Sequence, residues 1–91
     1  MLTGKKKRIL RAKGNQIKPE VWIGRQGVTK GGITTLENSF NTKELVKVKM
    51  QDGCPSTKEE IAHIICQKTG AELIQVLGNT LLFYRPFPEQ E

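Results

Sequence analysis

A short glycine-flanked segment, Gly24-Arg25-Gln26-Gly27, contains the residues of this chain best suited to hold a ligand. Its two glycines let the backbone turn tightly and approach a ligand without a clash of Cβ atoms. A helix is expected soon after Gly27, and a loop that enters a helix presents unpaired N–H groups to a phosphate. Arg25 would add a charge-assisted hydrogen bond. Such a short motif also occurs as a plain turn, so its surroundings must decide between the two interpretations.

The charges around this segment favour a polyanionic partner. The chain holds 15 Lys and Arg against 9 Asp and Glu, a formal net charge of +6. Up to Lys30, nine basic residues stand against one acidic residue, Glu20, whereas six basic residues stand against eight acidic ones after Lys30. Like charges in such a block repel one another, and the block is retained when a partner outside the protein neutralises it. Each phosphate that the protein neutralises releases counterions, which favours binding of a nucleic acid. A basic surface that is merely solvated is the alternative interpretation.

The N-terminal cations are predicted to lie on a helix. Thr3 can cap its N-terminus, the helix is expected to run to about Lys13, and Gly14 can take the left-handed conformation that ends helices. Its apolar stripe is predicted to consist of Leu2, Ile9, Leu10 and Ala12, with Lys5, Lys6 and Lys13 beside it, and its outward ridge of Lys7, Arg8 and Arg11. Packing of the stripe would leave the cationic ridge exposed.

The middle of the chain is predicted to hold a strand, a helix and a second strand. Val21–Ile23 is a β-rich run that stops at Gly24, and Thr29 is a suitable cap for the helix that follows. The buried edge of this helix is expected to consist of Ile33, Leu36 and Phe40. Leu45–Met50 alternates, with Val46, Val48 and Met50 on one face and Leu45, Lys47 and Lys49 on the other. The two lysines are therefore expected to line an exposed face of the sheet.

The C-terminal part is predicted to form a helix followed by a hairpin. Asp52–Pro55 indicates a turn, and Ser56 with Glu59 forms a capping box for a helix that ends at Gly70. The core-facing residues of this helix are expected to be Ile61, Ile64 and Ile65. Glu72–Leu77 and Thr80–Tyr84 are apolar runs separated by Gly78-Asn79, which indicates a β-hairpin.

The predicted element order is α-β-α-β-α-β-β, an α/β fold with three helices and a four-stranded mixed sheet. Because β-α-β crossovers are right-handed, the first three strands are expected to run parallel and the fourth antiparallel to its neighbour. The 91 residues have room for one domain. We expect it to span residues 1–91, with flexible ends at 1–2 and 87–91.

Over nearly its whole length the sequence resembles a stand-alone CRM domain of the YhbY type. The matching segments are, in order, Leu2–Lys5, Ile17–Pro19, Ile23–Thr29, Glu44–Lys49 and Ile74–Pro86. The resemblance implies an open α/β sandwich similar to the C-terminal domain of bacterial translation initiation factor three. It also implies an RNA-binding G-x-x-G loop and association with precursors of the large ribosomal subunit, whereas plant organellar relatives act in intron splicing.

The resemblance transfers roles to particular positions. The loop role falls on Gly24 to Gly27, and the basic-surface role on the cations of the first helix. Family members often have leucine-alanine-histidine after that helix, whereas this chain has Lys13-Gly14-Asn15. The change replaces an apolar anchor by a cation and a helix stop, so it affects the docking angle of the helix. Arg25, Lys18 and Lys30 are expected on the same side of the fold as the helix ridge. The full set expected to contact RNA is Lys5, Lys7, Arg8, Arg11, Lys18, Gly24, Arg25, Gln26, Gly27, Lys30, Lys47 and Lys49.

Two aromatic residues, Trp22 and Tyr84, have rings on which a base could stack. Trp22 is expected in the core, because short strands before a β-α turn are commonly buried. Tyr84 is expected to share a sheet face with Leu82, Lys47 and Lys49, where it could stack a base. Packing of Tyr84 as an edge residue is the favoured interpretation.

Catalytic, metal and cofactor sites are not indicated. His63 falls opposite the isoleucine stripe of its helix, and no Ser-His-acid set, carboxylate pair or P-loop can be assembled. His63 and Cys66 are three residues apart, but a cysteine pair and a fourth ligand are missing. Cys54 and Cys66 form no C-x-x-C, and the sequence indicates neither an export signal nor a membrane-spanning run. We therefore expect a cytoplasmic, reduced protein that is not an enzyme.

The favoured hypothesis is a monomer that binds ribosomal RNA, or precursor particles of the large subunit, during ribosome assembly. An intron-splicing or RNA-chaperone module on the same fold is one alternative. A protein-interaction domain that docks an acidic partner on its first helix is another.

Overall fold

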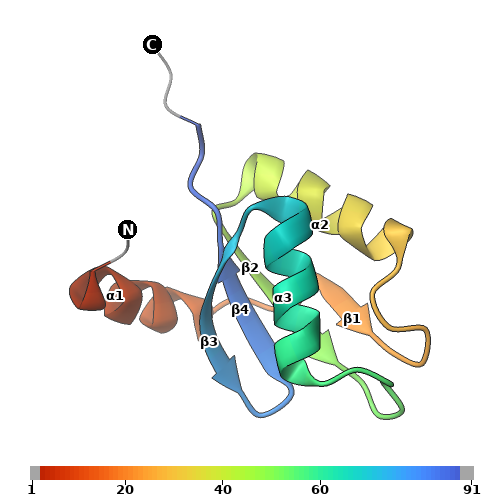
Figure 1. Cartoon of the computed structure of the whole chain (residues 1–91). Coiled ribbons are helices and arrows are strands. Elements are labelled where there is room, and N and C mark those ends of the chain that lie inside the picture. The colour runs from red at the N-terminus through yellow and green to blue at the C-terminus, as the bar shows by residue number, and fades with distance from the viewer. Residues whose placement is uncertain (1–2, 89–91) are drawn as a thin grey trace.

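The computed structural model describes residues 3–88, which form three helices and a four-stranded sheet (Figure 1). The helices are α1 (Gly4–Gly14), α2 (Lys30–Thr42) and α3 (Lys58–Thr69). The strands are β1 (Val21–Ile23), β2 (Leu45–Met50), β3 (Glu72–Leu77) and β4 (Thr80–Tyr84). The predicted order α-β-α-β-α-β-β is confirmed. Across residues 3–88, no helix combines the length and apolar character that a membrane span requires.

The sheet has the strand order β1-β2-β4-β3. β1 pairs with β2 in parallel, and β4 is antiparallel to both β2 and β3. The first three strands therefore share one direction, as predicted. The position of β4 between β2 and β3 was not part of the prediction. The turn at Gly78, with a φ of 60°, folds β4 back onto β3, but the pairing of the other edge of β4 with β2 is a feature of the tertiary structure that the turn does not dictate.

One face of the sheet is covered by α2 and α3. On this face β2 and β4 contribute four side chains with 0% exposure, Val46, Val48, Leu81 and Phe83. The helices cover them with Leu36, Phe40, Ile61 and Ile65. Ile33 and Ile64 were also expected on the buried helix edges, but they are half-buried because they line a groove between α2 and α3.

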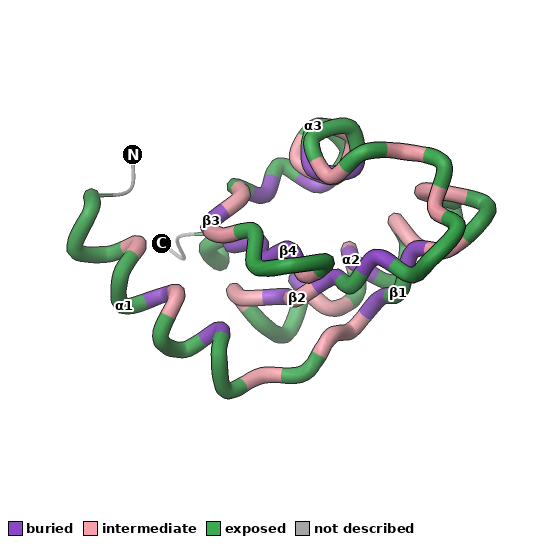
Figure 2. The backbone as a smooth tube through the Cα atoms, turned by 90° about the horizontal axis from the view of Figure 1, so that it is seen from below, coloured by how far each residue is buried: buried purple, intermediate pink, exposed green. Residues whose placement is uncertain are grey.

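α1 covers part of the opposite face (Figure 2). It contacts β2, β3 and β4, and its Leu10 packs into a second cluster with Ile74, Leu82 and Tyr84. At the end of the helix Gly14 comes so close to the sheet that an added Cβ would lie 2.3 Å from Leu82 Cδ2. Gly14 is therefore a helical contact residue, and its prediction as a left-handed stop was wrong. The close approach to Leu82 requires glycine there, and the cap is Asn15, with a φ of −68°.

α1 meets the sheet with a different face from the predicted one. Leu10 and Gly14 face the sheet, so Lys7 and Arg11 beside them are half-buried, and the prediction of these two as outward residues was wrong. Ile9, predicted in the buried stripe, is 49% exposed, and Ala12 is also exposed. The exposed cations of α1 are Lys5, Lys6, Arg8 and Lys13. Leu2, assigned to the same stripe, lies outside the described residues.

Threonine side chains begin all three described helices. Thr3 Oγ1 accepts from Lys6 N at 3.1 Å and Thr29 Oγ1 accepts from Gly32 N at 3.0 Å, as predicted. The capping box of α3 lies one residue later than predicted. Thr57 Oγ1 accepts from Glu60 N at 3.1 Å, and Glu60 Oε1 accepts from Thr57 N at 2.9 Å. Ser56 remains in the preceding turn, where its carbonyl accepts from Cys54 Sγ at 3.7 Å. The hydrogen bonds from Thr57 lower the pKa of the Glu60 carboxyl.

Arg85 ties the end of β4 to both covering helices. Its Nη1 donates to Glu37 Oε2 of α2 at 3.0 Å and to the carbonyl of Thr69 in α3 at 2.9 Å. Its guanidinium carbon lies 5.0 Å from the centroid of the Phe40 ring. Beyond it, the N–H of Phe87 donates to Glu44 Oε2 at 3.0 Å. Of the ends predicted to be flexible, residues 1–2 and 89–91 lie outside the described residues, and the single-domain span remains a prediction.

Candidate nucleic-acid interface

The Gly24–Gly27 loop is a tight, exposed turn between β1 and α2. The N–H of Gly27 donates to the carbonyl of Gly24 at 3.0 Å, which closes the turn. Gly27 has a φ of 67°, a conformation that costs a residue with a Cβ about 1–2 kcal/mol. Arg25 and Gln26 occupy the tip and are both exposed. The loop therefore offers two polar side chains and a turned backbone to solvent.

The segment that follows β2 packs against the loop and holds it in place. The N–H of Gln51 donates to the carbonyl of Ile23 at 2.8 Å, and a Cβ on Gly24 would lie 3.0 Å from Gln51 Oε1. The aliphatic stem of Arg25 lies against Gly53, where an added Cβ would be 3.2 Å from Arg25 Cγ. The stem is thus positioned by packing while the residue as a whole stays exposed.

The N-terminus of α2 opens directly beside the loop. The first N–H groups of a helix have no partner within the helix, and they carry the positive end of its dipole. Thr29 caps Gly32 here, and the first turn contains Lys30, Gly31 and Gly32 with no acidic residue. Gly31 is exposed and has no side chain that could cover these N–H groups. Loop and helix end together form an arrangement suited to a phosphate.

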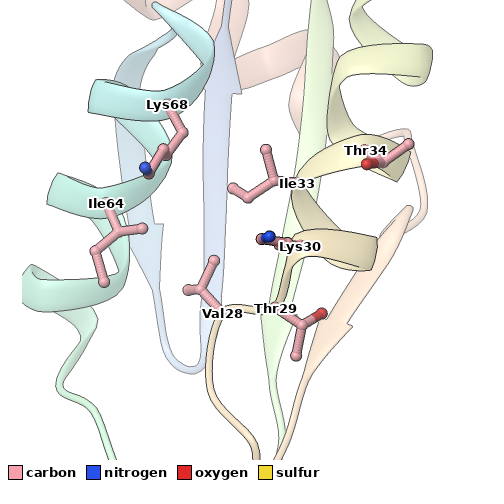
Figure 3. Close-up of a pocket in the computed structure, with 7 residues that line it drawn as sticks. All are labelled: Val28, Thr29, Lys30, Ile33, Thr34, Ile64 and Lys68. Atoms are coloured by element: carbon pink, nitrogen blue, oxygen red, sulfur yellow. The ribbon is translucent and has the colours of Figure 1, made fainter.

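A groove between α2 and α3 adjoins the loop (Figure 3). Its volume is about 390 Å³, and Val28, which follows Gly27, forms one end of it. Val28, Ile33 and Ile64 make its apolar lining, and Lys30 and Lys68 reach it from the two helices. Lys68 was not among the predicted residues. Its spacing of four from Ile64, which places both on one face of α3, is the signal that could have found it.

The loop and α1, which carries the N-terminal cations, lie at opposite edges of the sheet (Figures 1 and 2). The loop follows β1 at one edge, whereas α1 contacts β2, β3 and β4 and extends past the β3 edge. Adjacent strands are about 4.8 Å apart, so the width of the sheet separates the two groups. Lys18 is exposed on segment 15–20, which connects them along the α1 side. The sheet face on which α1 lies therefore extends between the two groups.

The two strand lysines differ in their surroundings. Lys49 is exposed, as expected for a lysine on an open sheet face. Lys47 is half-buried, and its Nζ donates to the carbonyl of Ile17 at 3.2 Å. Lys47 therefore fastens segment 15–20 to the sheet in addition to carrying charge.

The predictions for the two aromatic residues are corrected by the packing of this face. Tyr84 is 7% exposed, lies on the interior strand β4, and has Lys6 Nζ 5.6 Å from its ring centroid, so α1 covers it. Trp22, expected in the core, is 53% exposed. The reason is that Val21 and Ile23 take the covered side of β1, which leaves Trp22 on the side that α1 does not reach.

The basic residues up to Lys30, named here the N-terminal basic block, are not neutralised within the described part of the chain. In residues 3–88 the ion pairs join Lys43 to Glu20 and Arg85 to Glu37. Both cations lie outside the block, and Glu20, its one acidic residue, is the partner of Lys43. The positive charge of the block is therefore available to an external anion.

The cysteines and the histidine do not form a site. Cys54 and Cys66 are free and half-buried, and burial raises the pKa of the Cys66 thiol. His63 is exposed on α3, as predicted. Among residues 3–88 there is no group of three His, Cys, Asp or Glu side chains placed to hold a metal ion.

Comparison with known proteins gives a consistent result. The family model described as CRS1 / YhbY (CRM) domain matches residues 2–85. A Bacillus subtilis protein named "Probable RNA-binding protein YqeI" is 32% identical over 91 residues, covering 100% of this chain and 95% of the relative. A Haemophilus influenzae protein named "RNA-binding protein" is 35% identical over 88 residues, covering 97% of this chain and 89% of the relative. The solution structure of SAV1595 from Staphylococcus aureus, presented as a candidate RNA-binding protein, matches with a TM-score of 0.81 at 34% identity, over 100% of this chain and 95% of that one.

Proposed function

The chain belongs to the CRS1 / YhbY (CRM) domain family, and we propose that it binds RNA through the Gly24–Gly27 loop and the N-terminal basic block. The observation that carries this proposal is the exposed loop, with Arg25 and Gln26 at its tip, at the N-terminus of α2. The names of its relatives support RNA as the partner.

The proposed contact is with the sugar-phosphate backbone. One phosphate binds against the loop and the first N–H groups of α2, and Arg25 donates to its oxygens. Lys30 and Lys68, in the groove beside the loop, hold the next part of the strand. The cations that α1 contributes to the N-terminal basic block contact the RNA at the edge of the sheet opposite the loop. Because these are mainly contacts to phosphates, they position the RNA without reading its sequence.

The proposed RNA is ribosomal, bound by the monomeric protein during assembly of the large ribosomal subunit. The support for this finer proposal is the motif resemblance, which extends from Leu2 to Pro86. Crosslinking in cells followed by sequencing of the bound RNA tests it. Enrichment of precursor large-subunit RNA is expected, whereas enrichment of introns or messenger RNA would instead favour the splicing or chaperone alternative.

The loop is tested by the double substitution Arg25→Asp with Gln26→Asp. Hydrogen bonds to charged groups are worth about 1.5–3 kcal/mol, so loss of the Arg25 contact should weaken RNA binding by roughly tenfold or more. Binding should also become less dependent on salt, since each lost phosphate contact lowers the slope of log K against log salt by about one. Fluorescence anisotropy with a labelled fragment of large-subunit RNA measures both quantities.

A control variant places two aspartates on another exposed surface and changes the net charge by −2, against −3 for the loop variant. His63→Asp with Gln67→Asp adds negative charge to the exposed face of α3, away from the loop. The control should retain near-normal affinity, and both variants should show the thermal unfolding of the parent. Equal affinity of the loop variant and the parent would show that the loop does not bind RNA.

A further inference from the structure

The uncovered part of the α1-side sheet face carries a row of four side chains, one from each strand. Trp22 of β1 is in register with Lys49 of β2, Lys49 with Thr80 of β4, and Thr80 with Leu77 of β3. Val21, Ile23, Val48 and Leu81, their chain neighbours, all belong to the core on the other face. The row Trp22-Lys49-Thr80-Leu77, named here the open row, therefore lies side by side on one surface.

The fold does not explain the apolar members of this row. Trp22 is 53% exposed and Leu77 is 64% exposed. α1 packs farther along the strands, over Leu82 and Tyr84, and leaves the open row uncovered. An exposed position on an edge strand is normally taken by a polar or charged residue, which also prevents edge-to-edge association. The exposed indole of Trp22 contributes little to the core, so its presence on this face indicates a binding partner outside the chain.

The surroundings of Trp22 contain the groups that recognise a nucleotide. A shallow hollow of about 570 Å³ lies beside the ring, lined by Trp22, Lys49, Met50, Gln51, Asp52 and Asn79. The indole face can stack on a base, and Lys49 can bind the attached phosphate. The side chains of Gln51, Asn79 and Asp52 can hydrogen-bond to base edges, and the Asp52 carboxylate suits a base amino group.

We propose that the open row is a stacking platform for an unpaired RNA base, with Trp22 as the stacking residue and Lys49 as the phosphate contact. This inference rests on the proposed function, because it concerns the same RNA. It adds that the bound region contains single-stranded nucleotides. The bases of a duplex are already stacked on one another, and only unpaired bases can be placed on an aromatic ring.

The position of the platform fits an RNA strand that reaches both binding groups. Ile23 follows Trp22 and leads directly into the loop at Gly24, so the platform begins at the loop. On its other side a smaller hollow, lined in part by Asn15, Lys47 and Leu77, continues to the C-terminal end of α1. The open row thus lies between the loop and the α1 cations, on the sheet face that extends between them.

The composition of the row favours RNA over a protein partner. The core of a protein interface is a contiguous apolar patch depleted in charge. Here Trp22 and Leu77 are separated by Lys49 and Thr80, and Lys47 lies on the same face two residues from Lys49. A single ring among cations matches the pattern of single-strand binding surfaces.

The chain offers a direct test, because Trp22 is its one tryptophan. Titration of the protein with oligoadenylate should quench its tryptophan fluorescence, since the base stacks on the indole. A blunt RNA duplex of the same length should bind through the cations and leave the emission nearly unchanged. Equal quenching by both RNAs, or by neither while anisotropy reports binding, overturns the platform.

Substitutions separate stacking from general apolar contact. Trp22→Leu should weaken oligoadenylate binding by roughly tenfold and leave duplex binding unchanged, whereas Trp22→Phe should retain most of the affinity. Phe87→Leu removes another exposed aromatic ring, 46% exposed and outside the open row, and should have no effect. Thermal unfolding of each variant checks that the fold is retained.

The outcomes distinguish this inference from the proposed function. If Trp22→Leu binds oligoadenylate as tightly as the parent while Arg25→Asp with Gln26→Asp is impaired, the platform fails and the loop proposal stands. If the parent binds neither RNA, both fail. If Trp22→Leu instead loses a protein partner that survives nuclease treatment and keeps its RNA affinity, the open row is a protein-docking surface and the platform is overturned.

Discussion

The two faces of the sheet are built from the same strands but are used differently. On the face covered by α2 and α3, Val48 and Leu81 have 0% exposure. On the other face, the adjacent residues Lys49 and Thr80 belong to the open row. α1 covers only the part of this second face around Leu82 and Tyr84. The difference shows that one face supplies the stability of the fold, while the other is only partly occupied by the chain itself.

Because of this division, the loss of stability that a substitution causes can be measured separately from its effect on RNA binding. Residues of the covered face are surrounded by α2 and α3, so removing a side chain there leaves a cavity. Residues of the open row have few neighbours, and replacing them should change stability little. Substitutions on the two faces can therefore test whether only the covered face contributes to stability.

The largest effect is expected on the covered face. Phe83→Ala removes a fully buried ring and should lower the free energy of unfolding by about 3–5 kcal/mol. Denaturant titration measures this loss, and RNA affinity at low temperature, corrected for the folded fraction, should stay near that of the parent. Lys49→Ala, on the neighbouring strand β2 and on the other face, should cost less than about 0.5 kcal/mol. Similar losses for the two variants would mean that the two faces do not differ in stability.

A smaller effect is expected where α1 meets the second face. Gly14→Ala places a Cβ 2.3 Å from Leu82 Cδ2, so helix or side chain must move. Overpacking of this kind costs about 1–3 kcal/mol, and it should outweigh the gain of up to about 1 kcal/mol that alanine normally brings to a helix. Thermal unfolding of the variant measures the net loss.

Gly4→Ala is the matched control for that substitution. It lies in the same helix and has nothing within 4 Å of the added Cβ, so it should leave stability unchanged or raise it slightly. Combining Gly14→Ala with Leu82→Val, which shortens the clashing side chain, should recover part of the loss. Stabilisation by Gly14→Ala alone would show that α1 is held less closely to the sheet than the structure indicates.

The smallest effect concerns the start of α3, one of the helices over the covered face. The capping box with Thr57 lowers the pKa of Glu60 in the folded state. The unfolded state therefore binds more protons at acid pH, and this contribution to stability is present above the ordinary pKa of 4.5 and is lost as the pH falls through the lowered value. In denaturant titrations across this range, Glu60→Gln should lose this part of the pH dependence and Glu59→Gln should keep it. Identical profiles for Glu60→Gln and the parent would show that the capping box does not contribute.

Much of the fold and the loop could be predicted from local sequence. Thr3 and Thr29 as helix caps, the alternation of Leu45–Met50 and the turn at Gly78 were recognisable because each depends on residues a few positions apart. The position of the Gly24–Gly27 loop between β1 and α2 followed from the same local patterns. The capping box was placed one residue early because Ser56–Glu59 and Thr57–Glu60 have the same spacing, and this spacing alone does not choose between them.

The sequence by itself determined the order of the elements, the caps of α1 and α2, the loop and the charge block. Only the tertiary structure decided that β4 lies between β2 and β3, that Gly14 meets Leu82, and that α1 leaves Trp22 uncovered. The physical reason is that periodicity records which faces of an element are apolar but not which partner covers each face. Coverage depends on the packing of segments far apart in the chain, and in this protein that packing separates the buried side chains from those open to a ligand.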